Sequence, residues 1–273
     1  MSKLPADCLN EIFEYLEEDK ISLRSCLLVN HLWCEVSVRI LWRSIRSYNT
    51  LISCLPNESK EILYKNGIIT STSTSNPPMF NYSSFCKVLS INQLNHEISK
   101  LLENQQSISS QDPKNIIVIQ EILKLLMNQI SSLKKIEFYN SLNIPNFTLF
   151  PGVKDCFKNL TELCCNSDIS PDFFYQLSQI CHNIQSLSVK FGIVTSDGLA
   201  DLISVQQNLR YLNVVQFCNC EGLTVDIIAS LTNLPDTITK LEIYGEDYNM
   251  PLSFIAKLSN LQEMTLSFDY YFF

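Results

Sequence analysis

The stretch Leu209-Arg-Tyr-Leu-Asn-Val214 shows a pattern that recurs through the second half of the chain. Its first, fourth and sixth residues are apolar, so the unit is L-x-x-L-x-L. Six copies follow one another, and their starting positions differ by 27, 24, 25, 29 and 23 residues. Such repetition predicts stacked supersecondary units that bury one continuous core. The apolar residues are Leu133, Ile136 and Phe138; Leu160, Leu163 and Cys165; Ile184, Leu187 and Val189; Leu209, Leu212 and Val214; Ile238, Leu241 and Ile243; and Leu261, Met264 and Leu266.

Two further features support this register. An asparagine stands immediately before the first apolar residue of four copies, at Asn159, Asn183, Asn208 and Asn260. Apolar segments of helical character separate the copies, at 173–180, 199–205, 225–231 and 252–258. Each unit is therefore expected to be a strand followed by a helix. The predicted fold is α/β, a curved right-handed solenoid with a parallel sheet on its concave side and helices on its convex side.

A degenerate earlier copy is placed at Cys86, Leu89 and Ile91, and a helical stretch at 116–130 separates it from the next copy. The polar stretch 104–115 is expected to be a loop. Residues 46–66 predict further helix, interrupted at Pro56. The Ser/Thr-rich run 70–78 offers little to bury, so we expect a mobile loop that is dispensable for folding.

Residues 5–45 predict three short helices. Leu9, Ile12, Phe13 and Leu16 have the spacing of one apolar helix face. Ser22 can cap a second helix, and a third is expected from Leu32 to Trp42. So small a bundle buries too little of its surface to be stable alone, so we expect a partner to cover the stripe.

Composition excludes several classes of function. The net charge of −8 and the pI near 4.9 argue against nucleic-acid partners. No run of 18 apolar residues predicts a membrane span, and no glycine motif predicts a nucleotide cofactor. The 11 cysteines include no C-x-x-C pair, so we expect reduced thiols in a cytoplasmic or nuclear protein without a bound metal. A nucleophilic cysteine needs a base beside it, and two of the three histidines fall in helical or repeat positions, so no cofactor and no enzymatic activity are expected.

The N-terminal part resembles an F-box. The residues that carry the resemblance are Leu4-Pro5, Leu9, Ile12-Phe13, Tyr15-Leu16, Ser25, Leu27 to Asn30, Trp33 and Leu41-Trp42. The second part resembles the cysteine-containing leucine-rich repeats often joined to F-boxes, as in fungal and protist F-box proteins. That resemblance is clearest from Cys181-His182-Asn183-Ile184 to Asp197-Gly198-Leu199. Two features depart from the family: Cys8 replaces a commoner acidic residue, and the repeat lengths vary.

This resemblance implies an F-box at 1–46, a helical linker with a mobile loop at 47–84, and leucine-rich repeats at 85–273. In that family the F-box binds a Skp-type adaptor, which connects the protein to a cullin and a RING subunit. The repeats select the protein substrate for ubiquitination, and the chain itself performs no chemistry. The alternative left open is a leucine-rich-repeat scaffold that is not coupled to ubiquitination.

The apolar stripe and the F-box resemblance together predict the adaptor-binding residues. The alternation of side chains along the strands predicts the substrate-binding residues. The expected adaptor-binding residues are Leu4, Pro5, Leu9, Ile12, Phe13, Leu16, Leu27, Val29 and Trp33. On the concave side, aromatic and cationic residues of neighbouring strands supply the anchors typical of interfaces. The expected substrate-binding residues are Lys190, Tyr211, Asn213, Lys240 and Tyr244. The aromatic sequence 268–273 is compatible with a truncated chain, a strand docked by a cap, or a self-association edge.

Overall fold

The structure is a computed structural model of the 273-residue chain. It describes residues 4–45, 47–69, 78–106, 113–139, 146–192, 194–216, 224–234, 236–245 and 252–268. The predicted loop at 70–78 lies outside the described residues except for Pro78, and so do residues 269–273. Of the predicted loop at 104–115, only 107–112 lie outside them. Residues 104–106 and 113–115 are helical, so the prediction was wrong at both ends. The chain divides into two compact units, Met1–Leu89 and Ser90–Phe273.

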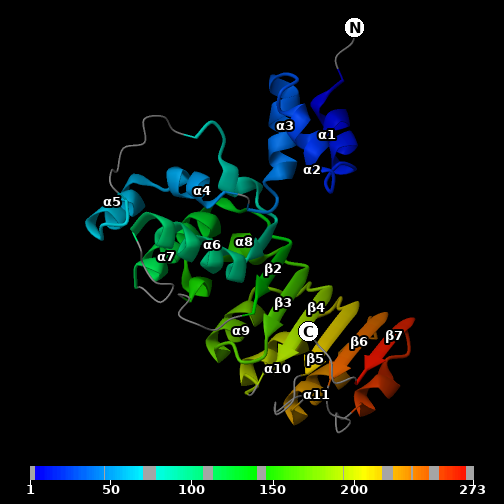
Figure 1. Ribbon diagram of the computed structural model, residues 1–273. Helices are drawn as coiled ribbons and strands as arrows, with labels where there is room; N and C mark the ends of the chain where they lie inside the picture. The colour runs from blue at the N-terminus through cyan, green and yellow to red at the C-terminus, as the bar shows by residue number, and fades with distance from the viewer. Residues whose placement is uncertain are drawn as a thin grey trace. The chain divides into compact units, whose positions relative to one another are not determined.

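The first unit begins with a bundle of three helices, α1 (Ala6–Glu14), α2 (Lys20–Cys26) and α3 (His31–Leu41), as Figure 1 shows. Asn30 caps α3 by accepting a hydrogen bond from the backbone N–H of Trp33. The cap predicted for α2 was wrong by three residues. Asp19, not Ser22, is the N-cap, and its carboxylate accepts from both the backbone N–H and the hydroxyl of Ser22.

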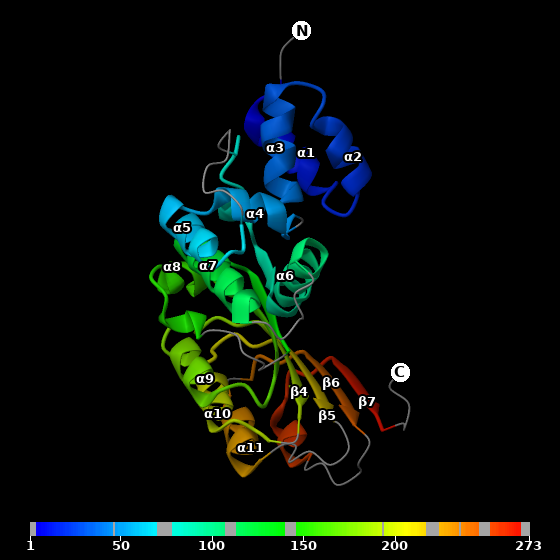
Figure 2. The ribbon, with the colours of Figure 1, turned by 60° about the vertical axis from the view of Figure 1, so that its left-hand side comes forward.

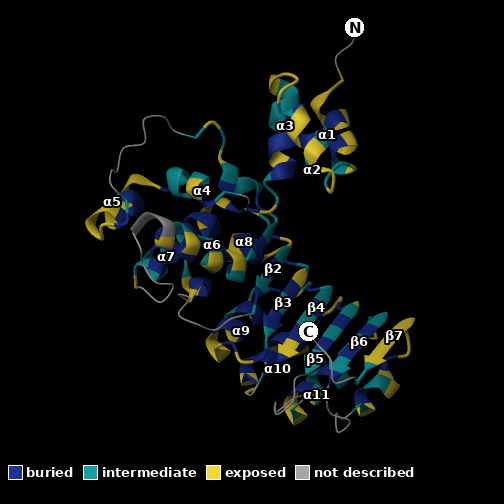
Figure 3. Cartoon of the chain, viewed as in Figure 1, coloured by how far each residue is buried: buried dark blue, intermediate teal, exposed yellow. Residues whose placement is uncertain are grey.

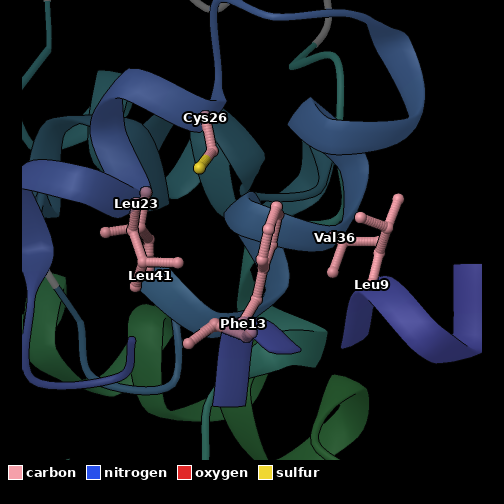
Figure 4. Packing of buried hydrophobic residues seen from close by; sticks show 7 residues of the cluster. Leu9, Phe13, Leu23, Cys26, Val36 and Leu41 are labelled. Atoms are coloured by element: carbon pink, nitrogen blue, oxygen red, sulfur yellow. The ribbon is translucent and has the colours of Figure 1, made fainter. Parts of the chain in front are cut away.

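The bundle core contains side chains from all three helices. Figure 4 shows how they pack against one another. Phe13 is fully buried, and its ring meets the ring of Trp33 edge to face at 5.1 Å. The buried residues of this core are Leu9, Phe13, Leu23, Cys26, Val36, Ile40 and Leu41.

The remainder of the first unit consists of α4 (Tyr48–Cys54), α5 (Asn57–Lys65), the 3-10 helix η1 (Tyr82–Phe85) and the start of strand β1 (Val88–Ser90). The predicted interruption at Pro56 is confirmed, because Pro56 separates α4 from α5. Backbone hydrogen bonds at Arg43 connect the end of the bundle to this part of the unit. Its carbonyl accepts from the N–H groups of Lys87 and Val88, at 2.7 and 2.9 Å.

The second unit starts with two long helices, α6 (Ile91–Gln106) and α7 (Pro113–Gln129). Strands then alternate with short helices. They are β2 (Lys135–Phe138), η2 (Phe147–Leu149), α8 (Val153–Phe157), β3 (Glu162–Asn166), α9 (Pro171–Ser178), β4 (Ser186–Phe191), α10 (Asp197–Ser204), β5 (Tyr211–Gln216), α11 (Val225–Thr232), β6 (Lys240–Gly245), η3 (Ser253–Lys257) and β7 (Glu263–Ser267). The segment predicted as helix at 252–258 forms the 3-10 helix η3 instead of an α-helix.

The strands form a seven-stranded sheet in sequence order, β1 to β7, and β2 to β7 pair in parallel. The predicted strands are confirmed, and each copy of the pattern is in register with the next. Leu187, for example, stands beside Leu163 on one side and Leu212 on the other. Helices α9, α10 and α11 cover one face of this sheet, as Figure 2 shows, an arrangement consistent with a solenoid.

Side chains also connect successive turns of the stack. Gln206 is fully buried, and its amide accepts from the N–H of Ile184 and donates to the carbonyls of Cys181 and Leu202. At the surface, the amide of Asn208 donates to Asn183 at 2.8 Å. The three bonds of Gln206 satisfy backbone groups at Ile184, Cys181 and Leu202, and the Asn208 bond joins two side chains. Among the described residues, no helix is both long and apolar enough to cross a membrane.

Candidate interaction surfaces

The helical bundle exposes large apolar side chains on its surface. Leu28 is 90% exposed, although leucine is usually buried, and Tyr15 is 91% exposed. We call these residues the bundle surface. Its members are Leu4, Ile12, Tyr15, Ile21, Leu28 and Val29. Where exposed apolar side chains form a contiguous patch, they are typical of an interaction site.

The structure divides the predicted adaptor-binding residues into two groups. Leu4, Pro5, Ile12 and Val29 are exposed, whereas Leu16, Leu27 and Trp33 are partly buried against the core. Leu9 and Phe13 differ from the prediction, because both lie in the bundle core with at most 2% of their surface exposed. In the folded chain these two side chains stabilise the bundle and offer a partner no surface.

The helix period explains this division. Leu9 and Phe13 are four residues apart and face α2 and α3 together, whereas Ile12 lies about 100° away from Phe13 around the helix. The sequence prediction treated the stripe as one surface. The three helices bury its inner half and leave its outer half exposed.

Sequence analysis missed Tyr15, Ile21 and Leu28 as candidate binding residues. A signal for Leu28 was present, because Leu27-Leu28-Val29 is an apolar run directly after α2. Three consecutive residues in a turn point in different directions, so they do not all face the same core. At least one of them had to be exposed, and the structure exposes two.

Electrostatic contacts fix the ends of the bundle helices. The guanidinium of Arg43, just after α3, pairs with both carboxylate oxygens of Glu14 at the end of α1 and with Glu17 at 2.8 Å. The hydrogen bond from Arg43 lowers the pKa of Glu14, and the positive charge lowers it further, while burial acts in the opposite direction. This bidentate pair holds α1 against α3 and so helps to fix the residues of the bundle surface.

The second candidate surface is the face of the sheet opposite helices α9, α10 and α11. Here the strands alternate as predicted, with mostly apolar residues toward the helices and mostly polar residues on the open face. The exceptions on β5 are Val215, on the open face, and Gln216, on the other. The registers align the polar residues in rows across the strands. One row runs Lys135, Glu162, Ser186, Tyr211, Lys240 and Glu263, and the next runs Glu137, Cys164, Ser188, Asn213, Glu242 and Thr265.

Glu242 organises the predicted substrate-binding residues on β5 and β6. Its carboxylate accepts from the hydroxyl of Tyr211 at 2.7 Å and from that of Tyr244 at 3.5 Å. The ammonium of Lys240 contacts the same carboxylate at 3.1 Å and also contacts Glu263 at 3.3 Å. The pKa of Glu242 is lowered, chiefly by the Tyr211 hydrogen bond. We call these five residues the Glu242 network.

Lys190 lies apart from this network. It is exposed on β4, and its ammonium lies 4.4 Å from the centroid of the Tyr139 ring on the far side of β3. Asn213 stands beside Glu242 in the sheet, and its side-chain oxygen is buried without a hydrogen-bond partner. The structure thus brings Tyr211, Lys240 and Tyr244 together and separates Lys190 from them.

Sequence analysis missed Glu242 as a candidate site residue. Its position between Lys240 and Tyr244 on one strand already placed all three side chains on the same face. The prediction weighed aromatic and cationic side chains as anchors and overlooked the carboxylate that they share.

Cysteines on and under the sheet are free thiols in the described part of the chain. Burial raises the pKa of Cys86 and of Cys181 to about 12, which keeps both protonated near neutral pH. The part of the chain that the structure describes contains no group of three or more His, Cys, Asp or Glu residues arranged to hold a metal ion.

Comparison with known proteins identifies the N-terminal bundle. Residues 1–47 match the family described as F-box-like, and this range covers all three bundle helices. The bundle is therefore an F-box-like domain. No curated protein matches the chain significantly.

Proposed function

We propose that the chain is the substrate-recognition subunit of an SCF-type cullin-RING ubiquitin ligase. The F-box-like domain binds a Skp-type adaptor, which connects it to the cullin and the RING subunit. The sheet unit, which we assign to the leucine-rich repeats, binds the protein substrate. The chain performs no chemistry itself and acts by bringing substrate lysines close to activated ubiquitin. We place this activity in the cytoplasm or the nucleus.

The observation that carries the proposal is the F-box-like match at 1–47 together with the bundle surface that the structure reveals there. F-box domains typically bind Skp-type adaptors and are non-catalytic. Burying one large apolar side chain contributes roughly 1.5–3 kcal/mol. Several such side chains on one small bundle can therefore support an interface after association costs are subtracted.

The assignment of the sheet unit rests on its sequence pattern and its register. The L-x-x-L-x-L copies align residue for residue across the parallel strands, and their spacing lies in or near the 20–29 residues of leucine-rich repeats. Among the described residues, α9, α10 and α11 cover the opposite face, which leaves the open face available to a partner (Figure 2). We place the centre of the substrate site at Tyr211, Asn213, Lys240 and Tyr244, with Lys190 at its margin.

Adaptor binding is tested best at the exposed residues of the bundle surface. The double variant Leu28→Asp and Val29→Asp places two charges that an interface would bury unpaired, so adaptor binding should fall at least a hundredfold. The measurement is calorimetric titration of the purified variant with the Skp-type adaptor. Tyr64→Asp, at an exposed apolar position on α5, is the matched control and should bind like the wild type.

Ubiquitin transfer separates a ligase subunit from an uncoupled scaffold. Reconstitution with adaptor, cullin, RING subunit, ubiquitin-conjugating enzyme and the wild-type chain should give ubiquitin chains on co-purified proteins, and the double variant should not. Wild-type adaptor binding without cullin recruitment would favour the scaffold. A double variant that still binds the adaptor with wild-type affinity would refute the adaptor interface.

A further inference from the structure

The last strand of the sheet differs from all the others in how much of its apolar side is exposed. Met264 is 53% exposed and Leu266 is 38% exposed. The residues beside them on β6, Leu241 and Ile243, are fully buried. The corresponding pairs on β3, β4 and β5 are at most 2% exposed: Leu163 and Cys165, Leu187 and Val189, and Leu212 and Val214. Figure 3 shows β7 as the exposed edge of the sheet.

The backbone of β7 also has unused hydrogen-bonding groups. The N–H of Glu263 donates to the carbonyl of Thr239, so Glu263 directs its backbone groups toward β6. In a parallel ladder these groups alternate along the strand, so Thr265 and Ser267 also face β6. The N–H and C=O groups of Met264 and Leu266 point toward the other edge, where the described residues supply no strand. An edge of this kind can pair with a strand of another chain.

We propose that this edge pairs with the same edge of a second copy of the chain, across a two-fold axis at Thr265. Antiparallel pairing about Thr265 places Met264 opposite Leu266 of the second copy and Leu266 opposite its Met264. Both pairs use the outward-facing backbone groups and can exchange two hydrogen bonds each.

Side-chain chemistry favours this register and this partner. Each exposed apolar residue is covered by an apolar residue, and Thr265 meets its own copy in a pair that stabilises sheets. Glu263 stands opposite Ser267, so no carboxylate faces another carboxylate among the paired residues. A register shifted to centre on Met264 would place Leu266 opposite the polar Gln262. The strand is thus complementary to itself, as a two-fold interface requires.

The association is tested first by mass. Sedimentation equilibrium of the full chain should show a concentration-dependent dimer. The double variant Met264→Lys and Leu266→Lys should raise its dissociation constant at least tenfold, because each lysine would face the other copy's lysine. Val225→Lys is the matched control, since Val225 is an exposed apolar residue at the start of α11 in the same unit. Circular dichroism of each variant checks that the fold is intact.

The register is tested by cross-linking. In the proposed pair Thr265 is a non-hydrogen-bonded position, where Cα atoms are about 4.5 Å apart and a disulfide can form. Thr265→Cys should cross-link two copies through position 265 under mild oxidation, and mass spectrometry of the peptides distinguishes this bond from bonds of the native cysteines. Glu263→Cys alone should not cross-link to itself, but Glu263→Cys with Ser267→Cys should.

Two outcomes would overturn the inference. A chain that stays monomeric at all concentrations would refute pairing between two copies, and a dimer unaffected by the paired lysines would place the interface elsewhere. A dimer that the lysines weaken, but that does not cross-link at position 265, would reject the register. None of these results depends on adaptor binding.

Discussion

The helical bundle and the sheet unit differ in how they divide apolar and polar side chains between buried and exposed positions. In the bundle, Phe13 is buried while Ile12 beside it is 48% exposed. In the sheet, β4 alternates strictly between apolar residues that face the helices and polar residues that face the open side. Side chains of a strand alternate with a period of two, so apolar and polar residues fall on opposite faces. A helix has 3.6 residues per turn, so in a three-helix bundle some apolar residues remain exposed. The bundle therefore retains apolar surface for a partner, and the open face of the sheet retains polar surface.

The largest effect is expected from removing the centre of the bundle core. Phe13→Ala should cost about 3–5 kcal/mol of stability, which a bundle of this size cannot tolerate. The two tryptophans, Trp33 and Trp42, both belong to the bundle region, so their fluorescence reports on it selectively. We expect this fluorescence transition to move to much lower urea while circular dichroism still shows the folded sheet unit.

Ile12→Ala is the control for that comparison. Ile12 belongs to the exposed half of the same stripe, so its truncation should change stability by less than about 1 kcal/mol. Equal losses from the two variants would show that the bundle does not distinguish an inner and an outer face.

The next effect concerns the buried amide that connects turns of the sheet unit. Gln206→Leu should cost about 2–4 kcal/mol, because the N–H of Ile184 and the carbonyl of Cys181 would lose their buried partner. Urea denaturation followed by circular dichroism measures this loss. Asn208→Ala removes an exposed amide pair instead and should stay within about 0.5 kcal/mol of the wild type. If Asn208→Ala cost as much, the stack would depend on its surface bonds.

An effect of intermediate size is expected on the open face of the sheet. Alanine at both Tyr211 and Tyr244 should weaken capture of a physiological substrate by about 2 kcal/mol, and adaptor binding should not change. Binding of substrates identified by adaptor-dependent co-purification is the measurement. Tyr175→Ala on α9 is the control, because Tyr175 is exposed on a helix. Substrate capture that survives the loss of both tyrosines would move the substrate site away from the Glu242 network.

The smallest effect concerns acid stability of the bundle. Arg43 lowers the pKa of Glu14 below its ordinary value of 4.5. The pair therefore contributes stability above that value and loses it as the pH falls through the lower, folded pKa. Tryptophan-monitored urea denaturation should show Arg43→Gln to be less stable than the wild type by about 1 kcal/mol near pH 7.

This difference should shrink as the pH falls below 4.5 and Glu14 becomes protonated in the folded chain. Arg39→Gln, which breaks an exposed pair with Glu35, is the control and should show a smaller change. A difference for Arg43→Gln that stayed constant down to low pH would contradict the assigned role of Glu14.

Much of the sheet unit could be predicted from sequence because its signal repeats. Six copies of one pattern fix the strands, their parallel order and their register, and the structure confirms them. Helix α6 was not predicted, although Leu94, Ile98 and Leu102 have helical spacing. It occurs once and lies beside a polar stretch, so no repetition supported it. Local caps were less predictable: Asp19 and Ser22 are equally good N-cap residues, and only packing decides between them.

The candidate surfaces were predicted less completely. The apolar stripe predicted that α1 contributes to the candidate surface. The sequence pattern does not determine which residues of the stripe the three helices bury. Leu9 and Phe13 are core residues for that reason. On the sheet, alternation placed Tyr211, Lys240 and Tyr244 correctly on one face, yet the side-chain torsions that direct both hydroxyls to Glu242 are not encoded in spacing.

The sequential order of the strands has a kinetic consequence. Among the described residues, β2 to β6 each pair with the strand before and the strand after, so the sheet unit is a linear array in which stability comes from nearest neighbours. Within the same described residues, β7 pairs with β6 alone and exposes its apolar side, so local opening should start there and advance toward β4 one turn at a time. Amide hydrogen exchange in the monomer should therefore be fastest at β7 and slow progressively inward, so that the exchange rate of each strand reports its position in the stack.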